Sequence, residues 1–261
     1  MTTESEGRKV IFITGAASGI GRATAVYFAE HGWFVGCFDI NTSALESLKR
    51  EIGAHCGMFH RLDVTDRAAV TGALAAFGEA SDGKLDILFN NAGITADGLF
   101  ESQSWDTIAA VVNVNLLASL SLIHAALPLL KATKGSLCLS TSSASATFGS
   151  AGRAVYSATK HAVKGLTEAL SVELATHGVR ASDLLPGIIE TGMFPPEMKA
   201  LVPKAGMWRL MSPNAIAEAV MAAYEGDKVH YYVPAELREY DIEATLMPEK
   251  IRDRCIDGGL F

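Results

Sequence analysis

The sequence predicts an α/β fold, with one doubly wound, mostly parallel sheet of about seven strands and helices on both faces. Two observations predict this fold. Short uncharged runs rich in β-branched residues, typical of strands buried on both faces, alternate with longer segments of helical periodicity. This alternation is not interrupted by a linker, an internal repeat or a low-complexity tract. Right-handed crossovers between parallel strands explain such an order, so we expect a single domain over residues 1–261.

The first predicted strand is the run KVIFIT over residues 9–14, and the helix after it spaces Ile20, Ala23 and Tyr27 on one face. The other apolar runs predict strands over residues 34–39, a third ending at 62–63, then 86–90, 136–141, 179–185 and 229–233. The periodic segments predict helices over residues 19–31, 43–52, 66–80, 107–130, 155–177 and 213–225. The remainder is a frayed polar leader (1–8), an irregular substrate-binding lid (186–212) and a C-terminal tail (234–261).

The composition excludes several classes of protein. With 49% hydrophobic residues the chain is not disordered, and 22 basic against 29 acidic residues, without a basic run, argue against nucleic acid and anionic membranes as partners. Residues 107–130 are uncharged and long enough to cross a bilayer. Asn113, Asn115 and His124 would be costly in hydrocarbon, so we expect this helix to lie against the sheet or another subunit. Four scattered cysteines predict reduced thiols in a cytoplasmic protein without a metal site.

A glycine-rich turn joins the first strand to the first helix, in the run Thr14-Gly15-Ala16-Ala17-Ser18-Gly19-Ile20-Gly21. Gly15 permits a tight turn, whereas Gly19 and Gly21 let the backbone approach a pyrophosphate and let the helix pack on the sheet. Helix N-termini favour negative charge, so Ser18 and Ile20 are expected beside the phosphates. Such a turn can be purely structural, but its place between strand and helix favours a dinucleotide site of the Rossmann type.

Asp39 ends the second predicted strand, where a carboxylate can accept hydrogen bonds from the adenosine ribose and would repel a 2′-phosphate. Ser18 and Ile40, the neighbouring positions suited to a basic residue, are uncharged. These residues favour NAD(H) over NADP(H), although Arg22 in the first helical turn weakens the preference slightly. Asp63 is expected to meet the adenine edge; the alternative for Asp63 is a helix N-cap or a turn residue.

Three further motifs follow in order. They are Asn90-Asn91-Ala92-Gly93, a serine cluster over residues 140–145, and Tyr156-Ser157-Ala158-Thr159-Lys160. With the glycine turn, they have the order and spacing of the short-chain dehydrogenases/reductases, and the chain from residue 9 through 233 resembles the single-domain branch of that family. The resemblance implies a Rossmann fold, a nicotinamide cofactor and oxidoreduction of an alcohol.

Tyr156 and Lys160 are four residues apart in a predicted helix, so their side chains share a face. A free tyrosine, with a pKa of about 10, is a poor base at neutral pH, but a nearby ammonium stabilises the phenolate and lowers this pKa. Tyr156 is then suited to take the proton of an alcohol as hydride leaves for the nicotinamide, and to return it in reverse. The alternative is an ordinary amphipathic surface pair.

The resemblance implies further roles. Lys160 would also hold the nicotinamide ribose, and Asn115 would connect Lys160 to solvent through a water. For Asn115 the alternative is a buried amide that satisfies helix backbone groups, with Asn113 close by. The cofactor residues carried over in the same way are Val64, Asn90, Ala92, Gly93, Tyr156, Lys160, Pro186, Gly187, Ile189 and Thr191.

Family enzymes hold the substrate oxygen with a serine that follows the fifth strand, commonly thirteen residues before the tyrosine. Counting back from Tyr156 selects Ser143, and counting forward from Gly135 selects Ser142. Ser143 is preferred because Gly149 fits the same register. The predicted catalytic set is therefore Asn115, Ser143, Tyr156 and Lys160, with Ser142 as the alternative serine.

The leading hypothesis is an NAD(H)-dependent oxidoreductase that interconverts a secondary alcohol and a ketone. Lid residues favour a hydrophobic or aromatic substrate, unless they only pack the lid onto the domain; they are Met193, Phe194, Met207, Trp208 and Met211. A catalytically silent dinucleotide-binding regulatory or scaffold protein is the alternative, and the complete catalytic set counts against it.

The helices over 107–130 and 155–177 have more apolar surface than one sheet face needs. The resemblance implies that they form a four-helix contact between subunits of a homotetramer or dimer. The tail over 234–261 would then complete the substrate site of a neighbouring subunit.

Overall fold

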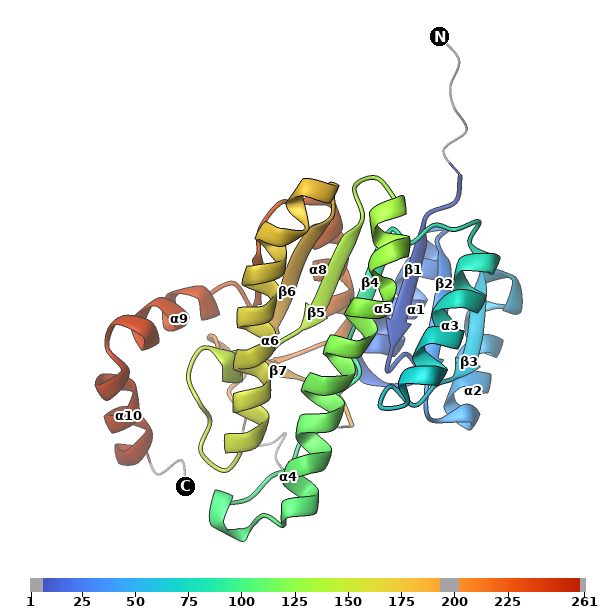
Figure 1. Cartoon of the computed structure of the whole chain (residues 1–261). Helices are drawn as coiled ribbons and strands as arrows, with labels where there is room; N and C mark the ends of the chain where they lie inside the picture. Colours follow the sequence, from blue (N-terminus) through green and yellow to red (C-terminus); the bar gives the residue numbers. More distant parts are fainter. Residues whose placement is uncertain (1–6, 193–201, 259–261) are drawn as a thin grey trace.

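The computed structural model describes residues 7–192 and 202–258. Within them, seven parallel strands form one sheet in the order β3-β2-β1-β4-β5-β6-β9 (Figure 1). The strands are β1 (Val10–Thr14), β2 (Phe34–Asp39), β3 (Gly57–Arg61), β4 (Ile87–Asn90), β5 (Leu137–Thr141), β6 (Arg180–Pro186) and β9 (His230–Val233). The predicted doubly wound α/β fold is confirmed, because the central strands are buried on both faces.

Helices cover the two faces of the sheet separately. One face packs against α1 (Gly19–Glu30), α2 (Thr42–Ile52) and α8 (Pro213–Glu225), and the other against α3 (Arg67–Ala80), α5 (Ala118–Ala132) and α6 (Ala154–Glu173). Two apolar clusters result, because alternate strand residues point to opposite faces. Ile11, Ile13 and Phe89 belong to the first cluster, and Phe12 and Leu88 to the second.

The long uncharged segment forms one helical rod with a local change of winding. It consists of α4 (Trp105–Val112), a π-helical turn (Asn113–Leu117) and α5. Among the described residues it is the one helix long and apolar enough to cross a membrane by length and composition, and 33% of its most apolar window is buried. The prediction was that this helix lies against the sheet or another subunit. Leu122, Ile123 and Ala126 belong to the apolar cluster on the sheet, and the contact with another subunit stays a prediction.

The described parts of the predicted leader and tail make contacts and helices that the sequence did not predict. Arg8, placed in the frayed leader, donates hydrogen bonds to the carbonyl oxygens of Gly32 and Trp33, both at 2.9 Å. The tail forms α9 (Leu237–Leu246) and α10 (Pro248–Asp257), which extend from the body in Figure 1. The predicted lid contains a short parallel pair, β7 (Ile188–Ile189) with β8 (Leu210–Met211). Residues 193–201, including the predicted Met193 and Phe194, lie outside the described residues.

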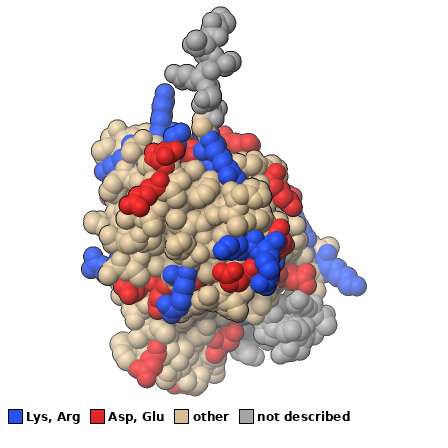
Figure 2. Space-filling view, turned by 90° about the vertical axis from the view of Figure 1, so that its right-hand side faces the viewer, with Lys and Arg blue, Asp and Glu red and all other residues tan. Residues whose placement is uncertain are grey.

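The surface charge is mixed on the face of the molecule that Figure 2 displays. Lys and Arg side chains lie among Asp and Glu side chains, without a continuous basic patch. This distribution agrees with the net charge of −7.

Candidate active site

The carboxyl ends of the strands surround a cavity of 1820 Å³, at the point where the strand order reverses between β1 and β4. Ligands of open α/β sheets bind at this position. Most residues predicted from the sequence line the cavity: Gly15, Ser18, Gly19, Ile20, Asp39, Asp63, Val64, Ala92, Gly93, Ser143, Tyr156, Lys160, Pro186, Gly187, Ile189 and Thr191. The predicted Gly21, Asn90 and Asn115 are not part of this lining.

The glycine turn between β1 and α1 is packed too closely for side chains. A Cβ on Gly21 would lie 2.1 Å from the carbonyl oxygen of Gly15, and Gly15 itself has a φ of +66°. Gly19, with a φ of +50°, faces the methyl group of Thr191 across the cavity mouth. Ser18 occupies the N-cap of α1 without a side-chain capping bond, which leaves the first amides of the helix to a ligand. These features fit a bound pyrophosphate.

Asp39 closes the end of the cavity beside this turn. Its carboxylate accepts hydrogen bonds from the backbone N–H of Ala17 at 3.0 Å and of Asn41 at 2.9 Å. Among the described residues, the cavity wall beside it contains Ser18 and Ile40 and no lysine or arginine. Arg61, the strand partner of Asp39 on β3, is not part of this lining. Arg22, the cation that weakened the sequence prediction, forms an ion pair with Glu51 outside this cavity.

Asp63 is a turn residue, which is one of the alternatives that the sequence left open, and it also lines the cavity. One carboxylate oxygen accepts from the Thr65 N–H at 2.9 Å and from its hydroxyl at 2.7 Å. These hydrogen bonds lower the pKa of Asp63. The N-cap of α3 is Asp66 instead.

Helix α6 brings Tyr156 and Lys160 to the opposite end of the cavity, and the Lys160 Nζ lies 5.5 Å from the Tyr156 ring centre. Burial raises the pKa of Tyr156, and the Ser143 hydroxyl and the Arg153 charge oppose this rise. Burial, and not the Lys160 charge that the sequence argument invoked, is therefore the largest influence on the pKa of Tyr156. Burial also lowers the pKa of Lys160 to about 8, and its ammonium donates to the Thr141 carbonyl oxygen at 2.6 Å.

The two candidate serines have different partners. The Ser142 hydroxyl is buried and donates to the backbone carbonyl of Lys160 at 3.0 Å, which joins the end of β5 to α6. The Ser143 hydroxyl interacts with the side chain of Tyr156 and accepts from the Ser145 N–H at 3.0 Å. Both serines line the cavity, and Ser143 is the one whose hydroxyl interacts with the Tyr156 side chain.

Asn115 lies behind the cavity wall in the π-helical turn. Its amide makes a reciprocal pair with the backbone of Ile94: the Ile94 N–H donates at 2.8 Å and the Asn115 Nδ2 donates back at 2.9 Å. The backbone carbonyl oxygen of Asn115 accepts a hydrogen bond from the Ser119 hydroxyl at 2.8 Å. Asn115 therefore fixes the segment after β4, and the competing Asn113 is exposed.

Asn90 is also buried rather than lining the cavity, and its amide lies 3.4 Å from the Ser140 hydroxyl. The neighbouring Asn91 lines the cavity and joins two strands. Its Nδ2 donates to the Thr14 carbonyl at 3.0 Å, and its Oδ1 accepts from the Thr141 hydroxyl at 3.1 Å. Asn91 belongs to the predicted motif, but the sequence assigned it no role. Its hydrogen-bond partners lie on other strands, and only the pairing of those strands shows them.

Comparisons with known proteins agree with this geometry. A family model described as "short chain dehydrogenase" matches residues 9–201. The chain belongs to the short-chain dehydrogenase/reductase family. It is 34% identical over 223 residues to the 3-oxoacyl-[acyl-carrier-protein] reductase FabG of Thermotoga maritima, covering 82% of this chain and 89% of the relative. It is 39% identical over 220 residues to the 2,5-dichloro-2,5-cyclohexadiene-1,4-diol dehydrogenase LinX of Sphingobium indicum, covering 82% and 87%.

A solved structure of the same family has a closely similar fold. The 3-ketoacyl-(acyl-carrier-protein) reductase from Brucella melitensis, crystallised in complex with NADH, superposes with a TM-score of 0.78 at 30% identity. The match covers 86% of this chain and 96% of the reductase. The family binds a nicotinamide dinucleotide and transfers hydride, and the geometry of this site fits both.

The substrate end of this dehydrogenase cavity includes residues that the sequence did not identify. They are Ile94, Phe148, Tyr240, Arg252, Cys255 and Ile256, beside the predicted Trp208. Trp208 and Tyr240 meet edge to face with ring centres 5.3 Å apart, which joins the lid to α9. The tail therefore lines the cavity of its own chain, whereas the sequence suggested the site of a neighbour. No sequence signal placed these tail residues, because their position depends on how α9 and α10 fold back.

Proposed function

We propose that this protein is an NAD(H)-dependent enzyme that interconverts a hydrophobic or aromatic secondary alcohol and the corresponding ketone. The observation that carries the proposal is one cavity with two chemically different ends. Asp39 stands at one end, where the described lining beside it includes no lysine or arginine, and Tyr156, Ser143 and Lys160 stand together at the other.

The glycine turn would hold the pyrophosphate of the cofactor, Asp39 the adenosine ribose and Lys160 the nicotinamide ribose. A 2′-phosphate would meet the Asp39 carboxylate, and the described lining beside Asp39 supplies no lysine or arginine to compensate, which favours NAD(H) over NADP(H). The Brucella melitensis reductase was crystallised with NADH, which supports the same preference. When bound, the nicotinamide supplies the hydride acceptor or donor.

The remaining chemistry belongs to side chains of this chain. Ser143 is placed to donate a hydrogen bond to the substrate oxygen, and Tyr156 to accept the proton of the alcohol or return it to the ketone. The Lys160 ammonium stabilises the phenolate that forms on Tyr156 during alcohol oxidation. Burial raises the cost of that phenolate, so Lys160 must remain charged for the proton transfer to proceed.

The substrate class follows from the lining of the catalytic end. Ile94, Phe148, Trp208, Tyr240 and Ile256 present mostly apolar surface. Two relatives point to cyclic alcohols by their names: the cyclohexadienediol dehydrogenase of Sphingobium indicum and, at 34% identity over 81% of this chain, the cyclohexanol dehydrogenase of Acinetobacter. We therefore place substituted cyclic secondary alcohols first in a substrate screen.

Cofactor choice is tested by comparing NAD with NADP. We expect kcat/KM to favour NAD by about 100-fold or more, because Asp39 rejects the 2′-phosphate. Asp39→Asn should reduce this ratio at least tenfold by removing the charge. Asp66→Asn is the matched control, since it removes a carboxylate from the N-cap of α3 and keeps the cap. A wild-type preference for NADP would contradict the assignment.

Turnover is tested separately from cofactor binding. NADH fluorescence is titrated first, and cyclic secondary alcohols with NAD are then assayed. We expect Tyr156→Phe to keep NADH binding and to lower kcat by about 10²–10⁴-fold. Wild-type protein that binds NADH without turning over any alcohol, with no effect of Tyr156→Phe, would instead support the silent regulatory or scaffold protein.

We also propose a homotetramer or dimer in the cytoplasm. Trp105 on α4, Leu117 in the π-helical turn and Leu120 on α5 are 77%, 52% and 39% exposed, which is unusual for large apolar side chains along one helical rod. The four cysteines are all free, as a reducing compartment would keep them.

A further inference from the structure

The C-terminal tail supplies part of the wall at the substrate end of the cavity. Tyr240 of α9 lines the cavity together with Arg252 and Ile256 of α10. Helix α10 is joined to α9 by an ion pair at 2.9 Å between Lys250 and Glu243. The placement of α9 on the body of the molecule therefore decides where these wall residues lie.

Helix α9 turns a narrow face toward the body. The buried residues of this helix are Leu237, Asp241 and Ala244, which are spaced four and three positions apart and so share one side. A carboxylate thus lies in the middle of the buried face, between one large and one small apolar side chain. Apolar contact is not directional, so these two side chains alone do not fix the rotation of α9 about its axis.

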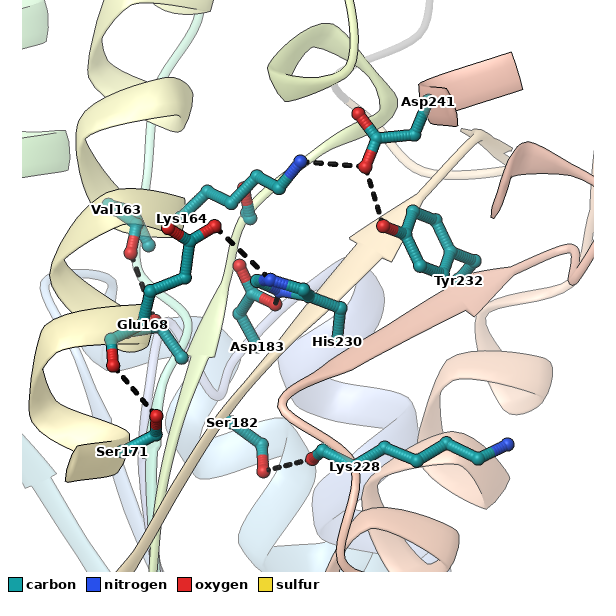
Figure 3. Close-up of polar contacts among 12 residues, drawn as sticks. Val163, Lys164, Glu168, Ser171, Ser182, Asp183, Lys228, His230, Tyr232 and Asp241 are labelled. Carbon is teal, nitrogen blue, oxygen red and sulfur yellow. Dashed lines mark hydrogen bonds and ion pairs between the residues drawn. The ribbon is translucent and has the colours of Figure 1, made fainter. Parts of the chain in front are cut away.

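Asp241 supplies directional bonds at this face. One of its carboxylate oxygens accepts from the Lys164 ammonium of α6 at 2.7 Å and from the Tyr232 hydroxyl of β9 at 2.6 Å (Figure 3). The side chains of Lys164 and Asp241 are only 17% and 11% exposed. An ion pair removed from water is favourable only when its partners are well aligned, so this contact selects one orientation of α9.

The two donors to Asp241 are held in a fixed frame. His230 lies two residues before Tyr232 on β9, so both side chains point to the same face of the sheet, toward α6 (Figure 3). Its Nδ1 lies 2.7 Å from the buried carboxylate of Asp183, and its Nε2 lies 3.3 Å from the carboxylate of Glu168 on α6. These contacts join β9 to the helix that carries Lys164.

The orientation of α9 decides the direction of Tyr240. Successive side chains of a helix point about 100° apart, so when Asp241 faces the body its neighbour Tyr240 points to one side. There it lines the cavity and meets Trp208 of the lid edge to face, with ring centres 5.3 Å apart. At the start of α9, Glu236 pairs with Arg209 of the lid at 2.8 Å. Trp208 and Tyr240 thus form an aromatic wall that depends on the placement of α9.

We propose that Asp241 is a positioning residue for substrate specificity: its bonds to α6 and β9 set the rotation of α9 that places Tyr240 in the cavity wall. Tyr240 is the specificity-determining residue. It favours cyclic over short open-chain secondary alcohols, because a ring presents more apolar surface to the aromatic wall. Asp241 is not part of the cavity lining and acts through Tyr240. This inference rests on the proposed function and refines its substrate class.

The kinetics of cyclohexanol and isopropanol with NAD test the proposal in the whole enzyme. We expect Tyr240→Ala and Asp241→Ala each to raise the KM for cyclohexanol about tenfold, with kcat and the KM for NAD changed less than about twofold. The kcat/KM for isopropanol should not change. The double variant should be no worse than either single variant, because the two residues act as one unit. Additive losses, or equal losses for both alcohols, would overturn the proposal.

Two further variants separate positioning from a general disturbance of the tail. Glu239→Ala is the matched control, because it removes an exposed carboxylate from the other side of Tyr240 on the same helix and should leave both alcohols unaffected. Lys164→Met replaces Asp241→Ala if that variant does not fold, since it removes the ion pair and keeps the apolar stem. It should also raise the KM for cyclohexanol, and an unaltered value would contradict the proposal.

A second measurement does not need turnover. The chain has three tryptophans, so fluorine NMR of protein labelled with fluorotryptophan gives few signals, and Trp208→Phe assigns the one of interest. Tyr240→Ala and Asp241→Ala should shift the Trp208 signal in the same direction, whereas Glu239→Ala should not move it. An unmoved signal in Asp241→Ala refutes the positioning. A moved signal in an enzyme without turnover refutes the proposed function and leaves the positioning intact.

Discussion

Ser142 and Ser143 are adjacent and chemically identical, and their different partners show how single residues acquire their roles in this molecule. The hydroxyl of Ser142 is used by the Lys160 carbonyl, which holds α6 against the end of β5. The hydroxyl of Ser143 turns toward Tyr156 in the cavity. Alternation along an extended chain separates the two side chains, so one serves packing and the other is available to a substrate.

Substitution of each serine should therefore have a different effect. Ser143→Ala should lower kcat/KM by about 10²-fold, as expected when one donor to a reacting oxygen is removed, and losing the bond from the Ser145 N–H should cost about 1 kcal/mol of unfolding free energy. Ser142→Ala should also cost about 1 kcal/mol of unfolding free energy, but with a smaller effect on kcat/KM. Steady-state kinetics and thermal unfolding of both variants make the comparison. Equal kinetic losses would contradict the assignment of Ser143.

Among the elements, the turn between β1 and α1 has the strictest steric requirements. The backbone of α1 approaches β1 so closely that Gly21 lies against the Gly15 carbonyl and the amide of Asn91. This contact sets the direction of α1, and with it the direction of the free amides at its N-terminus. The position of the helix and the phosphate site are therefore two consequences of one packing contact.

Gly21→Ala tests this dependence. A Cβ placed 2.1 Å from the Gly15 oxygen must displace α1, so we expect a loss of about 1–3 kcal/mol in unfolding free energy and weaker NADH binding. Gly72→Ala on α3 is the control, because nothing lies within 4 Å of its added Cβ. That variant should gain about 0.5–1 kcal/mol from helix propensity. Unaltered NADH affinity in Gly21→Ala would contradict the role of the contact.

At the scale of the whole molecule, part of the exposed apolar surface lies on the rod formed by α4, the π-helical turn and α5, where Trp105, Leu117 and Leu120 are exposed. Its inner side packs on the sheet through Leu122, Ile123 and Ala126, whereas Trp105 and Leu117 face outward. Association of helices from two subunits would remove this apolar surface from water, so this side of the rod is suited to a contact with a second subunit.

Leu117→Lys should therefore shift the protein toward monomers, because a charge in an apolar contact between subunits is strongly unfavourable. Sedimentation velocity measures the change. Ala75→Lys, at an exposed position on α3, adds the same charge away from the rod and should leave the assembly unchanged. A wild-type protein that sediments as a monomer would refute the predicted homotetramer or dimer.

The sequence alone determined the fold class, the glycine turn, Asp39 and the Tyr156–Lys160 pair. These features are local, because a strand's apolar run, a turn's glycines and a four-residue helical spacing are all visible over a few positions. Only the tertiary structure gave Ser142 and Ser143 their different hydrogen-bond partners and placed Tyr240 and Ile256 of the tail in the cavity. Those relations join residues far apart in the chain through strand register and helix packing, which no local pattern specifies.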